Sequence, residues 1–312
     1  MNGPASYTKI VTRLAQMTGG RCLTVRQRLA PQNPFPAALL DVFHAYMTLL
    51  APPPGTPHEA VPTSSIILAG DSSGACLALA LLQVLLTLRR QNLASDVKYH
   101  GHQVDIELPA SLTLISAVGE LTNSLPSYKS NASADVFPEK IPCLQPGFPT
   151  CKNWPSKPPR GNLYCDAPTL CHPLASPTAS KDWTGSPPLW FASGQEMIVD
   201  AVKVIAQTAY SQGTTVVFHE YKAMPHIFLW RCPGSPQSEK CWSDWAEFCK
   251  AIDEGKPVAS RAVLVEPKGL HEHDLDVSKL TPLTVDDAYG MMREATKSIR
   301  SFTGQKKGNA ML

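Results

Sequence analysis

Charge is scarce in this sequence, and its scarcity excludes several classes of partner. Charged residues make up 17% of the 312 residues, and the formal net charge is only +2. Lysine and arginine form no stripe with interleaved aromatic residues, so the composition does not favour nucleic acid or an anionic membrane. The longest apolar run, residues 75–88, is too short to span a bilayer and is typical of a buried helix. We therefore expect no nucleic-acid partner and no membrane span.

Cysteine is present, but its number and spacing do not indicate a disulfide framework or a zinc site. There are nine cysteines, an odd number, and none forms a C-x-x-C pair, which argues against both a fully paired secreted framework and a zinc ribbon. Cys143, Cys151, Cys165 and Cys171 crowd one segment, so one or two local disulfides stay open as an alternative to reduced thiols. Residues 1–20 lack the apolar core of a signal peptide, and we expect a cytoplasmic chain.

Short apolar runs alternate with helical patterns along most of the chain. This alternation predicts a mostly parallel sheet covered by helices on both faces, an α/β fold. The predicted strands are residues 22–25, 65–69, 108–118, 188–192 and 214–218. The predicted helices are residues 6–18, 36–50 and 75–88, and a further one that ends near residue 212.

Two segments depart from this rhythm and suggest the domain organisation. Residues 119–187 are rich in proline and serine with little periodicity, which is typical of a lid or substrate-binding insertion. Residues 1–118 and 188–252 would be the two parts of the core. Residues 253–312 would be a polar C-terminal extension with one helix near 284–300.

Residues 70–74 read Gly-Asp-Ser-Ser-Gly and fit the pattern G-x-S-x-G. They follow a predicted strand and precede a long apolar helix, which is the setting of a nucleophile elbow, with Ser72 as the nucleophile. The sharp turn favours glycine, and we expect a side chain at either Gly70 or Gly74 to clash with the neighbouring strand or helix. The Ser73 backbone N–H, at the amino end of the helix, is the predicted oxyanion donor.

A serine nucleophile needs a histidine base and a carboxylate that orients it, in the order serine, acid, histidine in this class of fold. Glu196 follows the predicted strand 188–192, and His226 follows the last one. Asp200 lies one helical turn beyond Glu196 and is the rival acid; Glu196 is favoured because it is nearer the strand end. His219 lies within a strand and is read as structural.

No metal site is expected. Residues 271–274 read His-Glu-His-Asp, but they lie in the polar tail without a matching ligand cluster elsewhere. We read them as a solvated surface.

Several blocks together resemble one family. Residues 28–41 contain R-L-A-P, P-F-P-A-A and a following aspartate, residues 172–177 read H-P-L-A-S-P, and residues 224–226 read M-P-H. With the G-D-S-S-G block, they resemble the hormone-sensitive-lipase-like esterases over roughly residues 1–252, and residues 154–196 are similar to fungal members.

The resemblance implies an α/β-hydrolase fold with a lid, acting without a cofactor on small or medium acyl esters. It implies the triad Ser72, Glu196 and His226, with glutamate in place of the more usual aspartate.

The chain also departs from the family pattern. Gln27 stands where the family usually has tyrosine, and the family's His-Gly-Gly-Gly oxyanion loop would lie just before Met1. We therefore expect the chain to lack that loop and the first strands of the sheet.

The predicted function, a carboxylesterase acting on small molecules, leaves two alternatives open. One is a tailoring esterase or thioesterase of a secondary-metabolite pathway, and the other is a catalytically weak binding homologue. The family's gibberellin receptors lose the triad histidine, whereas His226 is kept here. The oligomeric state stays open.

Overall fold

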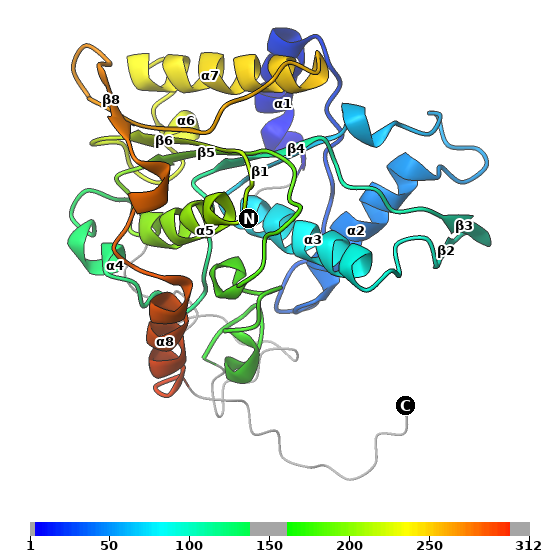
Figure 1. Cartoon of the computed structure of the whole chain (residues 1–312), viewed down its shortest axis with the longest axis horizontal. Helices are drawn as coiled ribbons and strands as arrows, with labels where there is room; N and C mark the ends of the chain where they lie inside the picture. Colours follow the sequence, from blue (N-terminus) through cyan, green and yellow to red (C-terminus); the bar gives the residue numbers. More distant parts are fainter. Residues whose placement is uncertain (1–3, 138–160, 300–312) are drawn as a thin grey trace.

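A six-stranded sheet lies at the centre of the computed structural model, which describes residues 4–137 and 161–299 (Figure 1). Its strands stand in the order β1 (Ile67–Asp71), β4 (Ser111–Ile115), β5 (Leu189–Gly194), β6 (Val216–Tyr221), β7 (Arg261–Val265) and β8 (Glu272–Leu275). The pairings from β1 to β7 are parallel, and β8 pairs antiparallel with β7. The predicted α/β fold with a mostly parallel sheet is confirmed. Strands β2 (Val97–Tyr99) and β3 (His102–Val104) form a separate hairpin.

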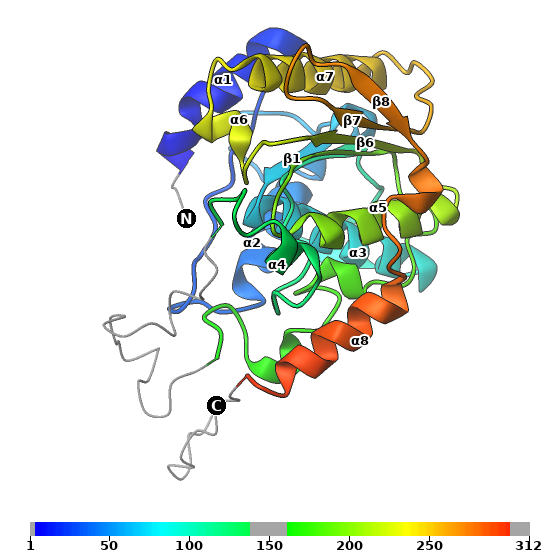
Figure 2. The same ribbon diagram turned by 90° about the vertical axis from the view of Figure 1, so that its left-hand side faces the viewer.

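Helices cover both faces of this sheet, as Figures 1 and 2 show. One face carries α3 (Ser73–Arg90) and α5 (Val199–Ser211), with α2 (Ala37–Leu50) packed on α3 and α8 (Val285–Thr296) on α5. The other face carries α1 (Thr8–Thr18) and α7 (Pro236–Asp253). The short helices are α4 (Ser127–Ser130), α6 (Phe228–Arg231), η1 (Pro4–Tyr7), η2 (Thr63–Ser65), η4 (Ala167–Thr169), η5 (Pro177–Ala179) and η6 (Val277–Lys279).

The central strands are apolar on both faces because both faces are covered. In β5, Leu189 and Phe191 join the core under α3 and α5, whereas Trp190 and Ala192 join the core under α1 and α7. Successive side chains of a strand point to opposite faces, so a strand buried on both sides reads as an unbroken apolar run. This is why the sequence of β5 predicts a strand without showing alternation.

Stacked indole rings connect the sheet to the helices on the α1–α7 face. Trp190 stacks on Trp245 at 6.3 Å between ring centroids, and Trp245 stacks on Trp242 at 5.2 Å. The Arg13 guanidinium of α1 lies 4.8 Å from the centroid of the Trp242 ring. Aromatic stacking therefore holds α7 against the sheet, and the cation–π contact holds α1 against α7.

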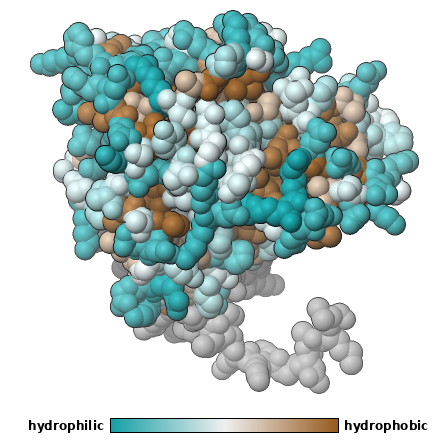
Figure 3. Space-filling view, viewed as in Figure 1, coloured by the Kyte–Doolittle hydropathy of each residue, from teal (hydrophilic) through white to brown (hydrophobic). Residues whose placement is uncertain are grey.

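Helix α3 is the one described helix long and apolar enough to cross a membrane by length and composition. Most of its side chains, among them Leu79, Leu82 and Leu85, are buried between the sheet and α2. On the face drawn in Figure 3, apolar side chains form separate patches among hydrophilic ones. The expected buried helix is confirmed.

Residues 119–137 and 161–187, the described parts of the expected insertion, contain only short helices, as the lack of periodicity predicts. Helix η5 contacts α3, α5 and α8, so this part of the segment packs against the core. Cys143, Cys151 and residues 154–160, where the resemblance to fungal esterases begins, lie outside the described residues, as do residues 1–3 and 300–312. The seven cysteines within the described ranges are free.

Two expectations about the sheet were wrong. Residues 22–25 form no strand; Leu23 is 62% exposed and Val25 38%, so this short apolar run has no neighbouring layer to pack against. Residues 253–299 contain more than a helix, because β7 pairs with β6 and extends the sheet beyond residue 252. The run Arg261–Val265 is short and lies between polar stretches, so the composition of this region did not predict the strand.

Candidate active site

The turn between β1 and α3 places Ser72 at the carboxyl edge of the sheet. Ser72 has φ 51° and ψ −119°, a conformation that costs energy for a residue with a side chain. Gly70 makes the turn possible, because a Cβ there would lie 2.6 Å from the backbone nitrogen of Ala75. The expectation for Gly74 was wrong: a Cβ there would meet nothing within 4 Å and would enter open space.

Backbone hydrogen bonds hold this strained residue from both sides. The Ser72 N–H donates to the carbonyl of Ile115 at 2.9 Å, at the end of the neighbouring strand. The Ser72 carbonyl accepts from the N–H groups of Cys76 and Val118, both at 3.2 Å. The position of the serine is therefore set by β1, β4 and α3 together.

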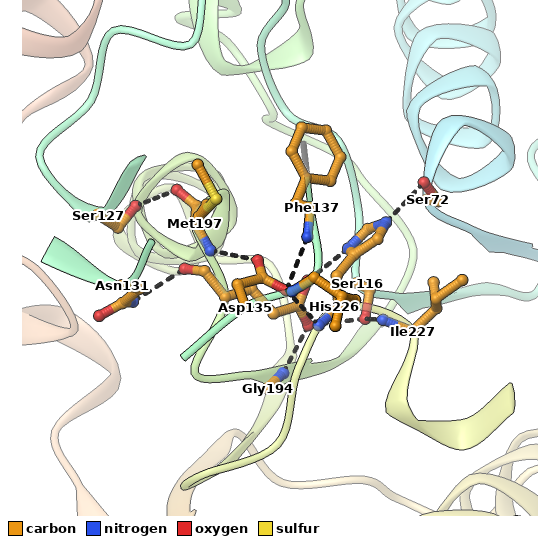
Figure 4. A network of polar contacts seen from close by, with 12 residues as sticks. Ser72, Ser116, Ser127, Asn131, Asp135, Phe137, Gly194, Met197, His226 and Ile227 are labelled. Carbon is orange, nitrogen blue, oxygen red and sulfur yellow. Dashed lines mark hydrogen bonds and ion pairs between the residues drawn. The ribbon is translucent and has the colours of Figure 1, made fainter. Parts of the chain in front are cut away.

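His226 approaches Ser72 from the loop that follows β6. The Ser72 Oγ lies 2.9 Å from His226 Nε2, and His226 Nδ1 lies 2.8 Å from Glu196 Oε2 (Figure 4). The carboxylate can only accept, so Nδ1 carries the proton and donates it, which leaves Nε2 to accept from the serine hydroxyl. The structure thus brings the three predicted residues into one hydrogen-bonded chain.

Glu196 is fully buried, and its carboxylate is well supplied with donors. Oε1 accepts from the Gly194 N–H at 2.6 Å and from the Ser116 hydroxyl at 2.7 Å, while Oε2 faces His226. A buried charge is tolerated only when hydrogen bonds replace its hydration. Gly194 must be glycine here, because a Cβ would lie 2.1 Å from the carbonyl oxygen of Met224 on the histidine loop.

Ser116 is a member of this network that sequence reasoning missed. It follows β4 directly, with φ +49°, and besides donating to Glu196 its hydroxyl accepts from the Ile227 N–H at 3.0 Å. It therefore links the acid to the residue after the histidine. The available signal was its position: a serine directly after a buried strand, at the edge where β1 and β5 also end.

Asp200 is not part of this chain of contacts. Its carboxylate accepts from the Ser127 N–H at 2.8 Å, and its own N–H donates to the Ser127 hydroxyl at 3.1 Å. It ties α4 to the first turn of α5. His219 likewise lies elsewhere: its Nδ1 is 3.2 Å from Asp244 Oδ2.

Asp71, immediately before Ser72, is a partly buried carboxyl that sequence reasoning did not single out. The Tyr7 hydroxyl donates to its Oδ2 at 3.1 Å, which ties η1 to the end of β1. Burial raises the pKa of Asp71, and burial together with the neighbouring carboxylate raises the pKa of Tyr7 to about 12.

Ser73 is the first residue of α3, so its N–H has no acceptor within the helix. This donor lies at the positive end of the helix dipole, beside Ser72. Residues 271–274 lie at β8, and among the residues the structure describes no group of three His, Cys, Asp or Glu side chains could hold a metal ion.

Comparisons with known proteins agree with this architecture. The acetyl-hydrolase of Streptomyces hygroscopicus is 28% identical over 241 residues, covering 77% of this chain and 68% of that protein. An esterase of Acinetobacter venetianus is 27% identical over 249 residues, covering 80% of this chain and 70% of the relative.

Among solved structures, an esterase of the bacterial hormone-sensitive lipase family superposes with a TM-score of 0.61 at 25% identity, covering 81% of this chain and 73% of that one. A hormone-sensitive-lipase homologue from a metagenome library gives a TM-score of 0.62 at 25% identity, over 81% and 74% of the two chains. The profile of one family, described as alpha/beta hydrolase fold, matches residues 1–230. The chain therefore belongs to the α/β hydrolase fold family, and its relatives include esterases of the hormone-sensitive-lipase type.

Proposed function

We propose that this chain is a carboxylesterase in which Ser72 is the nucleophile, His226 the general base and Glu196 the orienting carboxylate. The observation that carries the proposal is the hydrogen-bonded chain from Ser72 Oγ through the imidazole to Glu196 Oε2, with the serine on a strained strand-to-helix turn. Relatives named esterase and acetyl-hydrolase support ester hydrolysis as the reaction.

The contacts suggest how the reaction would proceed. His226 Nε2 accepts the hydroxyl proton as Ser72 Oγ attacks the ester carbonyl carbon, and the carbonyl π electrons move to its oxygen. The imidazolium, stabilised by Glu196, then gives the proton to the departing alkoxide oxygen as the C–O bond breaks. Water repeats the sequence on the acyl-enzyme, releases the acid and restores the serine.

The tetrahedral oxyanion needs donors near Ser72. The Ser73 N–H is the donor we assign from this part of the chain, because it belongs to the residue after the nucleophile at a helix amino end. A preorganised donor of this kind stabilises charge that develops only in the transition state.

The substrate class we propose is small-molecule esters with small to medium acyl groups. Phe137, Val118, Cys76 and Ile198 form an apolar cluster beside the serine–histidine pair, and the Phe137 ring lies 5.0 Å from the imidazole. An apolar wall at this position favours an alkyl chain over a charged group.

Labelling with a fluorophosphonate probe followed by peptide mapping tests the proposal. We expect Ser72 to be labelled, and Ser72→Ala to abolish both labelling and hydrolysis of p-nitrophenyl butyrate. Ser73→Ala is the matched control, since it removes the neighbouring hydroxyl and keeps the backbone donor. Labelling that survives Ser72→Ala would show that another residue is the nucleophile. A folded wild-type chain that neither reacts with the probe nor hydrolyses the ester would leave the binding homologue.

A further inference from the structure

The segment from α4 to Phe137 passes beside the two loops that carry Glu196 and His226, and Asp135 lies between them (Figure 4). Asp135 Oδ1 accepts from the His226 N–H at 2.7 Å. Its Oδ2 accepts from the Met197 N–H, also at 2.7 Å, on the residue next to Glu196. One carboxylate therefore links the backbone of the acid loop to the backbone of the histidine loop.

The local turn holds this carboxylate in place. Oδ1 also accepts from the Val136 N–H at 2.7 Å and the Phe137 N–H at 3.3 Å, which restricts the Asp135 side chain before it reaches either loop. With its orientation set by its own turn, the carboxylate can act as a spacer of defined length between Met197 and His226.

Two further contacts from the same segment reach the acid and the base. The Asn131 side-chain amide donates to the Glu196 carbonyl at 2.9 Å. The Phe137 ring stands edge-on to the His226 imidazole, with the ring centroids 5.0 Å apart and the planes at 87°. None of the hydrogen bonds from this segment involves Ser72 Oγ, His226 Nε2 or the Glu196 carboxylate, so they act on the position of the two loops and not on the proton transfer itself.

We propose that Asp135 is a positioning residue that sets the distance between Glu196 and His226, and thereby the alignment of the imidazole with Ser72; this inference rests on the proposed function. The position needs two acceptor oxygens, because backbone N–H groups approach the side chain from both loops. An asparagine would present its NH₂ group to one of these donors, and one loop would lose its anchor.

The cost of losing the anchor should appear in turnover. Reacting groups displaced by about 1 Å can slow catalysis by about a hundredfold. We expect Asp135→Asn to lower kcat by about 10- to 100-fold, with KM for p-nitrophenyl butyrate changed by less than about threefold. The reason is that the Asp135 carboxylate contacts the backbone N–H of Phe137 and not its ring. The rate of fluorophosphonate labelling of Ser72 should fall in parallel, since it too depends on the aligned base.

Glu120→Gln is the matched control. Glu120 lies in the residues that lead into this segment and is buried, and it likewise accepts several backbone N–H groups. These come from Thr122, Asn123 and Ser124, all in its own turn. Both variants are expected to lower the melting temperature, and only Asp135→Asn should lower kcat and the labelling rate per folded molecule. If Asp135→Asn does not fold, Asp135→Glu keeps the charge and displaces the oxygens by one methylene, and the same fall in kcat at unchanged KM is expected.

The outcomes separate the two proposals. If wild-type Ser72 is labelled and whichever Asp135 variant folds keeps the wild-type kcat, the positioning role is wrong and the proposed function stands. If Glu120→Gln lowers kcat as much as the Asp135 variant, the effect reports general loosening of the segment, and the positioning role is again overturned. If wild-type Ser72 is not labelled, the proposed function is wrong, and the positioning role that rests on it is wrong as well.

Discussion

Ser72 and the hydrogen-bonded pair Glu196–His226 lie at the same edge of the sheet, yet they are held in different ways. Ser72 is fixed by backbone hydrogen bonds to Ile115 at the end of β4, to Cys76 of α3 and to Val118. Glu196 and His226 are fixed by side chains of Ser116, Asn131 and Asp135, which come from segments far away in sequence. A strained backbone is thus held by regular secondary structure, whereas the acid–base pair depends on irregular loops fastened by side chains.

The sharpest test of the acid–base half compares the two carboxylates one helical turn apart. Losing the carboxylate that orients the base can cost on the order of 10⁴ in kcat. We expect Glu196→Gln to show a loss of that order, because its carboxylate faces His226, and Asp200→Asn to stay within about tenfold of wild type, because it only anchors Ser127. The kcat values of the two variants are measured by steady-state kinetics on p-nitrophenyl butyrate. A larger loss in Asp200→Asn than in Glu196→Gln would assign the role of orienting carboxylate to Asp200.

A single added methyl group should disrupt the turn that positions Ser72. In Gly70→Ala the added Cβ would lie 2.6 Å from backbone atoms of Gly74 and Ala75, so we expect a loss of about 1–3 kcal/mol in the free energy of unfolding together with reduced labelling of Ser72. Gly74→Ala meets open space within a helix, so we expect it to be neutral or to stabilise by up to about 1 kcal/mol. Chemical denaturation measures both, and equal destabilisation by the two substitutions would refute the local account of the turn.

Removing one donor from the acid measures how far the side-chain network matters. Ser116→Ala deletes a hydrogen bond to a buried carboxylate, a contact worth about 1.5–3 kcal/mol, and the acceptor of the Ile227 N–H. We expect kcat to fall by about tenfold. Ser111→Ala, at the start of the strand that Ser116 follows, is the control. The Ser111 hydroxyl is buried without a hydrogen-bond partner in the structure, so kcat of this variant should be unchanged. A Ser116→Ala enzyme with wild-type kcat would show that the Gly194 N–H suffices for the acid.

The smallest effect is expected away from the site, where His219 and Asp244 form a pair that resembles the acid–base pair without a nucleophile. Burial alone would raise the pKa of Asp244, but hydrogen bonds with His219 and Tyr221 and the charges of His219 and Lys240 outweigh it, so the pKa is lowered. A carboxyl with a lowered pKa stabilises the fold above its unfolded-state pKa of about 3.9, and this stabilisation is lost as the pH falls through the folded-state value.

We therefore expect Asp244→Asn to reduce the free energy of unfolding by about 1 kcal/mol at pH 7, and the difference from wild type to shrink below about pH 4. Urea denaturation at pH 7 and pH 3.5 measures this difference in the free energy of unfolding. The kcat of Asp244→Asn at pH 7 should equal that of the wild type. A difference that grows toward low pH would show that the sign of the pKa shift is wrong.

Much of the fold could be predicted because local patterns encode it. The apolar run of α3, the strand-to-helix turn at Ser72 and the unbroken apolar strand β5 each follow from a few consecutive residues. The strand expected at residues 22–25 failed because an apolar run becomes a strand only when a neighbouring strand supplies hydrogen bonds. Strand β7 was missed for the converse reason: its partner β6 makes it a strand, although polar residues surround it.

The sequence by itself determined the strand-to-helix turn at Ser72 and placed two candidate acids, Glu196 and Asp200, and then His226 after later strands, because backbone propensity and strand position act over short distances. Only the tertiary structure decided between Glu196 and Asp200 as the partner of His226, and only it brought Asp135 to His226 across 91 residues and Ser116 to Ile227 across 111. Such contacts depend on where loops from different strands meet at the edge of the sheet. No local pattern records that meeting, since a serine or aspartate in a loop carries the same local signal whether it faces water or a catalytic backbone.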